Sequence, residues 1–153
     1  MLMIGEYSTP ETRVWLMERV RSKEEDIEVR TISLDTLGKI GDPIAISLIR
    51  EIALGDTWKK DSDKILQHKA IGWLGKLNIT DTVPSLVKMF RKGRWIPNKR
   101  RDQLKIVIAQ ALWKMEDDTA RQVVRDGCRN TSGSVRRVCE TLTQKHIDIK
   151  ENN

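Results

Sequence analysis

The residues with the clearest chemical potential are cations gathered in one stretch of the chain. Eight Lys and Arg residues and a single acid, Asp102, lie between Lys88 and Lys105, so this stretch carries a net charge of +7 and the rest of the chain −1. Side chains of this kind bind phosphate or carboxylate groups. We therefore predict a partner-binding site formed by Lys88, Arg91, Lys92, Arg94, Trp95, Lys99, Arg100, Arg101 and Lys105.

Residue patterns typical of catalysis are absent from the sequence. It has no Gly-rich phosphate loop, no His-Glu-x-x-His pattern and no Ser-His-Asp arrangement. The spacing of His68, His146, Cys128 and Cys139 is not that of a metal site. We expect no enzyme, no cofactor and no metal. Two cysteines and the lack of an apolar run of ~20 residues predict a reduced, cytoplasmic protein without a membrane anchor.

The elements that carry the cations repeat along the chain. Leu37-Gly38-Lys39, Leu74-Gly75-Lys76 and Leu112-Trp113-Lys114 follow one another at intervals of 37 and 38 residues. A period in the range ~20–50 residues indicates stacked supersecondary units. Helix-capping acids follow each phrase: Asp42 before Pro43, then Asp81, then Asp117 or Asp118. Helical apolar spacing predicts helices over about 9–21, 26–40, 43–54, 62–77, 81–92, 99–116, 118–128 and 132–145.

These phrases resemble the HEAT-repeat family, in particular its phycobilisome-lyase-type HEAT-like repeats. The first unit carries the pattern at Val29, Arg30, Ser33, Leu37, Gly38, Ile40, Gly41, Asp42 and Pro43, whereas Gln67 and Lys105 replace the Arg in the next two units. The resemblance implies an all-α, right-handed superhelical α-solenoid of about three and a half hairpins. One domain is expected over 1–153, with an N-terminal helix at 9–21, repeats at 26–54, 62–92 and 99–128, and a half-repeat at 132–145.

The resemblance also implies a binding scaffold whose partners lie along the ridge of second helices. We predict a non-catalytic module that holds an acidic protein surface or segment on this ridge, around Arg50, Lys88, Arg91, Lys92 and Arg125. Nucleic acid is the alternative partner, although such a site would ideally draw cations from more than one repeat. A subunit of a lyase-type enzyme is a weaker alternative. A solvated basic loop without a ligand also stays open.

Aromatic residues and the chain ends give further expectations. Trp58 and Trp95, one repeat apart, either seal the seams between hairpins or form an exposed ladder, and Trp15 and Trp73 have core spacing. Gly38 and Gly75 should let a neighbouring helix approach closely, whereas Trp113 should change the local curvature. The last half-repeat must be covered by the 147–149 tail or by another molecule, or stay uncovered. We favour a monomer, with end-to-end dimerisation as the alternative.

Overall fold

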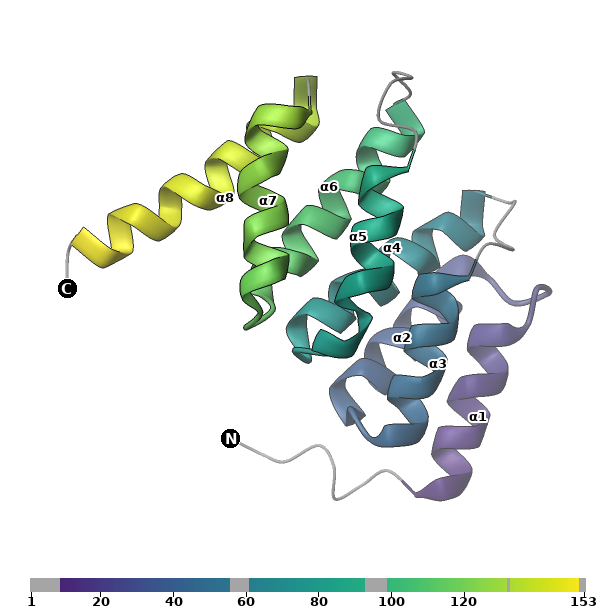
Figure 1. Cartoon of the computed structure of the whole chain (residues 1–153). Coiled ribbons are helices and arrows are strands. Elements are labelled where there is room, and N and C mark those ends of the chain that lie inside the picture. The colour runs from purple at the N-terminus through teal and green to yellow at the C-terminus, as the bar shows by residue number, and fades with distance from the viewer. Residues whose placement is uncertain (1–8, 56–60, 93–98, 132, 152–153) are drawn as a thin grey trace. The chain divides into compact units, whose positions relative to one another are not determined.

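The protein is helical throughout the part that the structure describes. The computed structural model describes residues 9–55, 61–92, 99–131 and 133–151. Its helices (Figure 1) are α1 (Pro10–Arg21), α2 (Ile27–Ile40), α3 (Pro43–Leu54), α4 (Asp61–Lys76), the short 3-10 helix η2 (Thr80–Thr82), α5 (Val83–Arg91), α6 (Lys99–Lys114), α7 (Asp118–Asn130) and α8 (Gly133–Glu151). No strand occurs among these residues. The all-α prediction is confirmed, and every predicted helix is present.

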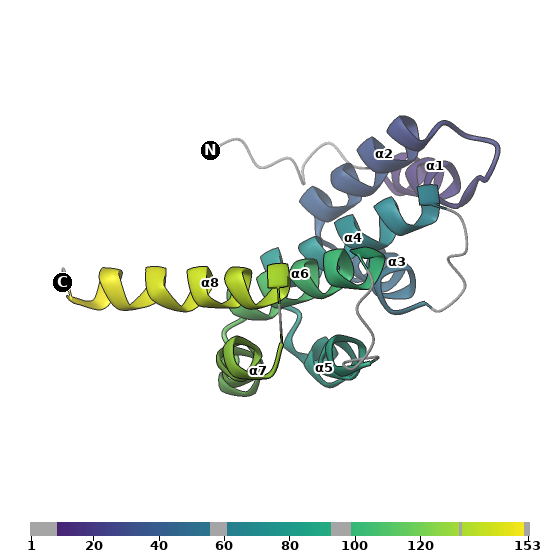
Figure 2. The ribbon, with the colours of Figure 1, turned by 90° about the horizontal axis from the view of Figure 1, so that it is seen from above.

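The chain forms two compact units, an N-terminal unit (Met1–Leu77) and a C-terminal unit (Asn78–Asn153). In the N-terminal unit α1 packs on α2, α3 packs on α4, and α2 lies beside α4. In the C-terminal unit α5 packs on α6, α7 packs on α8, and α6 lies beside α8. Figure 2 shows α5 and α7 of the C-terminal unit in one layer and α6 and α8 in the other. Both units therefore use one packing scheme, which is consistent with a helical repeat.

Two of the predicted acidic caps are confirmed. A carboxylate oxygen of Asp42 accepts a hydrogen bond from the backbone N–H of Ala45 at 2.8 Å, at the start of α3. At the start of α7, Asp117 accepts from the backbone N–H of Ala120 at 2.7 Å. Each bond satisfies a donor that the first helical turn leaves unpaired. Asp117 rather than Asp118 is therefore the cap.

The predicted cap at Asp81 is wrong. Asp81 lies inside η2, and Thr82 occupies the N-cap position of α5 without a side-chain capping bond. The Thr82 hydroxyl instead donates to the carbonyl of Ile79 at 2.6 Å. A 3-10 turn has replaced the open cap, because its own backbone bonds satisfy part of the helix start.

A polar side chain near the start of one helix closes the end of the helix before it. Arg30 of α2 is buried, and its Nε donates to the carbonyl of Val20 at 3.0 Å. Gln67 of α4 donates through Nε2 to the carbonyls of Ala53 and Gly55 at 3.2 and 3.1 Å. The last carbonyls of a helix have no partner within that helix, so these side chains satisfy groups that would otherwise be unbonded.

The same device recurs in the C-terminal unit. Arg136 of α8 donates through Nε to the carbonyl of Thr131 at 2.9 Å, at the end of α7. Lys105 of α6 has the equivalent sequence position, 38 residues after Gln67, and is only 7% exposed. The Arg position of the sequence pattern therefore serves the packing of the fold, whichever polar residue occupies it.

Gly38 is confirmed as a point of close approach. A Cβ at this position would lie 2.2 Å from Cδ2 of Trp73, so the indole of α4 packs directly on the α2 backbone. Trp73 is not simply a core residue, however. It is half-buried, and its Nε1 donates to Oδ1 of Asp35 at 2.9 Å. The Nζ of Lys76 lies 4.4 Å from the centre of the indole ring.

Two other expectations need correction. Trp15, predicted to be a core residue, is 53% exposed on α1. The backbone of residues 147–149, expected as a separate tail, continues α8 to Glu151. Trp58 and Trp95 lie outside the described residues. Trp113 is half-buried, and the change of curvature beside it stays a prediction.

Candidate functional site

The predicted basic site is divided between α5 and α6. Lys88 and Arg91 lie in the last turn of α5, Lys92 is its C-cap, and all three are exposed. Arg101 is exposed in the first turn of α6. The backbone of Lys99 and Arg100 belongs to that same turn, and their side chains lie outside the described part, as do Arg94 and Trp95.

Lys105 does not belong to this surface. Its side chain is 7% exposed, whereas the sequence prediction grouped it with the exposed cations. The repeat explains the difference, because this position in α2 and α4 is also buried and polar, as Arg30 and Gln67. The packing of the repeat therefore buries Lys105, although it belongs to the basic stretch of the sequence.

The exposed cations of α5 continue onto its neighbour α7. Val83, Leu86 and Phe90 are buried on one side of α5, which leaves Lys88 and Lys92 exposed. Arg125 and Arg129 follow Lys88 and Lys92 by 37 residues and are exposed on α7. α7 contacts α5 in the same layer (Figure 2). We call this set the basic face: Lys88, Arg91, Lys92, Arg125 and Arg129.

Sequence reasoning missed Arg129. The 37-residue period that relates Lys88 to Arg125 also relates Lys92 to Arg129, so aligning the second helices would have found it. Arg50, which stands 38 residues before Lys88 and was expected on the same ridge, is half-buried in α3 of the N-terminal unit, and its place on the ridge stays a prediction. Among the described residues, the basic face belongs to the C-terminal unit alone.

The cations of the two units are neutralised to different extents. Six ion pairs join described side chains of the N-terminal unit: Arg13–Asp42, Arg19–Glu25, Arg21–Glu51, Arg30–Asp63, Lys64–Asp61 and Lys69–Asp35. None of the five cations of the basic face takes part in these pairs. In the sequence, Lys and Arg outnumber Asp and Glu by 16 to 9 from Asn78 to Asn153, against 12 to 13 before Asn78. The basic face therefore lies in the unit in which cations exceed acids.

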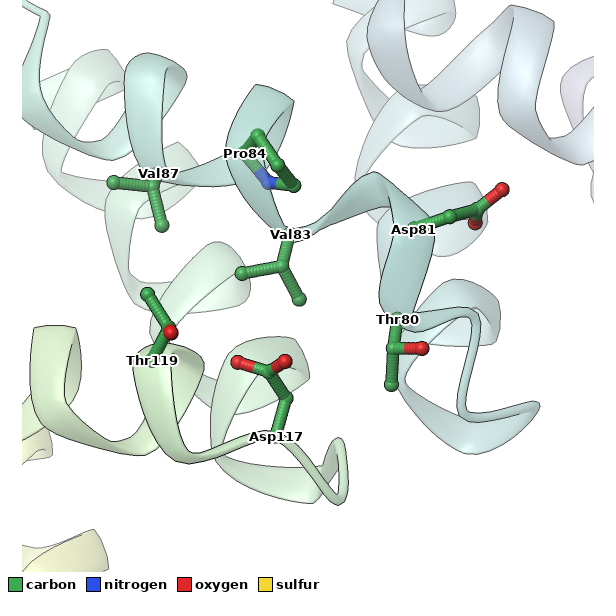
Figure 3. A pocket seen from close by; sticks show the side chains of 7 residues that line it. All are labelled: Thr80, Asp81, Val83, Pro84, Val87, Asp117 and Thr119. Carbon is green, nitrogen blue, oxygen red and sulfur yellow. The ribbon is translucent and has the colours of Figure 1, made fainter.

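Acidic residues occupy the opposite end of the α5–α7 layer. A hollow of about 300 Å³ lies where η2, α5 and α7 begin, and Figure 3 shows the side chains that line it: Thr80, Asp81, Val83, Pro84, Val87, Asp117 and Thr119. Asp117 is already engaged as the cap of α7. Negative charge at the helix starts and positive charge at the helix ends both complement the helix dipoles. The layer is thus polarised along its helices.

The pKa shifts of Cys139, Asp35 and His68, which lie outside the basic face, follow from burial and neighbouring groups. Burial, with a smaller contribution from Cys128, raises the pKa of Cys139 to about 11, so this thiol stays protonated at neutral pH. Burial alone would raise the pKa of Asp35, but the hydrogen bonds from Lys69 and Trp73 outweigh it and the pKa is lowered. Burial, assisted by Lys64, lowers the pKa of His68.

Among the described residues, no group of three or more His, Cys, Asp or Glu side chains is placed to hold a metal ion. None of the described helices is long and apolar enough to cross a membrane. In the comparison with known proteins, no family model matches this chain, and the search of curated proteins finds no significant match.

Proposed function

We propose that the chain is a right-handed α-solenoid of HEAT-like hairpins that serves as a non-catalytic binding module. The repeated packing scheme of the two units supports the solenoid. The recurrence of Arg30 and Gln67, both buried and both closing a preceding helix, supports the HEAT-like pattern at the level of single contacts. Stacks of this kind present extended surfaces on which partners bind.

The partner in this proposal is an acidic protein surface or segment, held by the basic face. One observation carries the proposal: Lys88 and Lys92 on α5 recur at the same spacing as Arg125 and Arg129 on α7, and all four are exposed. Two parallel rows of cations can contact several carboxylates of one bound segment. Such a site favours a partner with distributed negative charge over a single small anion.

The expected affinity follows from the exposure of these side chains. An exposed ion pair contributes ~0.2–1 kcal/mol, so five pairs would contribute about 1–5 kcal/mol in total. Salt screens such pairs over a distance of about 8–10 Å at physiological ionic strength. We therefore expect fast, weak and strongly salt-dependent binding to a simple acidic probe, with tighter binding only where a partner adds apolar contacts.

Nucleic acid is the second candidate, and the position of Arg125 and Arg129 is the observation that favours it. A nucleic-acid site draws phosphate contacts from several elements, and these residues extend the exposed cations from α5 to α7. A base could stack on an aromatic residue such as Trp95 of the predicted site, which lies outside the described residues. The acidic protein segment remains the first candidate.

A binding titration with two probes tests both candidates. Fluorescence anisotropy would follow a labelled oligoglutamate peptide and a labelled oligonucleotide over a series of salt concentrations. We expect K88E/R125E to weaken oligoglutamate binding by about tenfold, because two reversals cost ~1.4 kcal/mol. The matched control K39E/K114E changes the net charge equally at exposed residues that are not members of the basic face, and should change affinity by less than about twofold.

The two variants distinguish a site from a general effect of charge. Equal weakening by K88E/R125E and K39E/K114E would show that net charge alone attracts the probe, and would overturn the basic face as a site. Preferential binding of the oligonucleotide, with a slope of log affinity against log salt of about −0.9 for each phosphate contacted, would establish the nucleic-acid candidate instead.

A further inference from the structure

A hollow of about 220 Å³ lies within the N-terminal unit, where α1 and α3 end and α2 and α4 begin. Its buried lining consists of Arg30, Asp63, Val20, Leu48 and Ile52, and none of its lining residues belongs to the basic face. Pockets for drug-sized ligands are typically ~300–1,000 Å³, so a hollow of this size suits a smaller molecule. We call it the N-terminal hollow.

A buried ion pair borders the N-terminal hollow. Arg30 is 4% exposed and Asp63 is 5% exposed, and Nη1 of Arg30 lies 3.4 Å from Oδ1 of Asp63. Hydrogen bonds between charged groups are typically ~2.7–2.9 Å long, so this contact is a loose one. The Nε of Arg30 donates to the carbonyl of Val20, and Oδ2 of Asp63 accepts no bond from a described residue. The pair therefore retains donors and acceptors that a ligand can use.

The exposed lining of the N-terminal hollow also carries both signs of charge. Arg21 and Glu51 form an ion pair at 2.8 Å, and both side chains are more than half exposed. Solvent weakens such a pair, so either partner can turn to a ligand at little cost. Lys23 is exposed and forms no ion pair with a described acid.

The rest of the buried lining is aliphatic. Val20, Leu48 and Ile52 are each 1% exposed. The hollow therefore combines cationic donors, carboxylate acceptors and aliphatic side chains. A ligand of one charge would leave the opposite sign unpaired in a poorly solvated place, which is costly. Water would bond to the ion pair but would gain nothing from the aliphatic lining.

We propose that the N-terminal hollow binds a small zwitterion, an α-amino acid with an aliphatic side chain. The ligand carboxylate accepts hydrogen bonds from Arg30 and Lys23, and the ligand ammonium donates to Asp63. The aliphatic group of the ligand lies against Leu48 and Ile52. A buried ion pair is stabilising only when further hydrogen bonds satisfy its remaining donors and acceptors, and the two charged ends of the ligand supply them.

An NMR titration of the full chain with three matched probes tests the proposal. Free leucine carries both charges, isocaproate lacks the ammonium and isoamylamine lacks the carboxylate, whereas all three share one aliphatic group. We expect leucine to give saturable shifts of the Arg30 Nε–H signal and of the Leu48 and Ile52 methyl signals. Each analogue should bind at least about tenfold more weakly, because it leaves buried charged groups without a partner.

Two substitutions assign the two ends of the ligand. D63N keeps the size of the side chain and an oxygen that can accept from Arg30, but removes the charge that the ammonium needs. In D63N the preference for leucine over isocaproate should fall from about tenfold to about twofold or less. K23E should weaken leucine binding by about fivefold. The matched control K39E, at an exposed position of the same unit that does not border the hollow, should change it by less than about twofold.

Each outcome bears on the proposal. The absence of a saturable shift at Arg30 and Ile52, up to the solubility limit of leucine, would overturn the site and leave water as the only occupant. Equal binding of leucine and isocaproate would overturn the zwitterion and indicate a site for anions. Equal effects of K23E and K39E would show that net charge alone attracts the probe. The NMR spectrum also reports whether D63N is folded, and if it is not, the probe series and K23E still decide.

Discussion

Replacing Gly38 with alanine should destabilise the N-terminal unit, although alanine is the better helix former. The new Cβ would lie 2.2, 2.3 and 2.7 Å from Cδ2, Cε2 and Cε3 of Trp73. The indole is not free to move away, because its Nε1 donates to Asp35 at 2.9 Å and the Lys76 ammonium lies over the ring.

The size of this destabilisation follows from two unfavourable contributions and one favourable contribution. Overpacking costs about 1–3 kcal/mol. Weakening the hydrogen bond from Trp73 to the Asp35 carboxylate costs up to about 1.5–3 kcal/mol more. The change from glycine to alanine within a helix returns about 0.5–1 kcal/mol. These contributions sum to a range of about 0–5.5 kcal/mol, and the free energy of unfolding should fall by about 2–3 kcal/mol, the centre of that range, in G38A.

Gly72 in α4 provides a matched control. A Cβ there would meet nothing within 4 Å, so G72A should raise the free energy of unfolding by about 0.5–1 kcal/mol. Urea unfolding followed by circular dichroism would measure both variants. In a W73A background, G38A should lose most of its cost. An unchanged or higher stability of G38A beside an intact Trp73 would refute the close packing of α2 and α4.

Two further predictions concern the C-terminal unit. D117A should lower the free energy of unfolding by about 1 kcal/mol, because it removes the hydrogen bond from the Ala120 N–H. D118A should change this free energy by less than half as much. A larger loss in D118A than in D117A, measured by urea unfolding, would contradict Asp117 as the cap. Because the pKa of Cys139 is raised to about 11, its unfolded thiol ionises first, so stability should fall by on the order of 2–3 kcal/mol between about pH 9 and pH 11. C139A should remove this component, and an unchanged pH dependence in C139A would contradict it.

The helices were predictable because their signals are local. The Leu-Gly-Lys period, the caps and the apolar spacing give the helices within a few residues of their observed ends, except that α8 continues six residues beyond its predicted end at 145. The prediction that Asp81 caps α5 was wrong because a 3-10 turn can replace a side-chain cap. An acid shortly before Pro84 is compatible with either structure. Trp15 misled because its spacing is that of a core residue, whereas the structure leaves it 53% exposed on α1, with the guanidinium of Arg19 5.6 Å from the centre of its ring.

The candidate site was predictable only in part because it depends on how two helices lie side by side. The density of cations identified Lys88, Arg91 and Lys92, but density alone also included the buried Lys105. The contact between α5 and α7 adds Arg129, which stands outside the basic run of the sequence. Burial and neighbouring helices, rather than charge in sequence, decide which cations can meet a partner.

The most direct test of the basic face is an affinity capture from the native host, with and without nuclease. Immobilised wild-type protein, K88E/R125E and K39E/K114E would be compared by quantitative mass spectrometry. We predict that wild type and K39E/K114E retain the same acidic proteins, that K88E/R125E loses them, and that nuclease has no effect. Equal retention by K88E/R125E would contradict the basic face as the binding surface, and loss of the captured proteins on nuclease treatment would contradict the acidic protein partner.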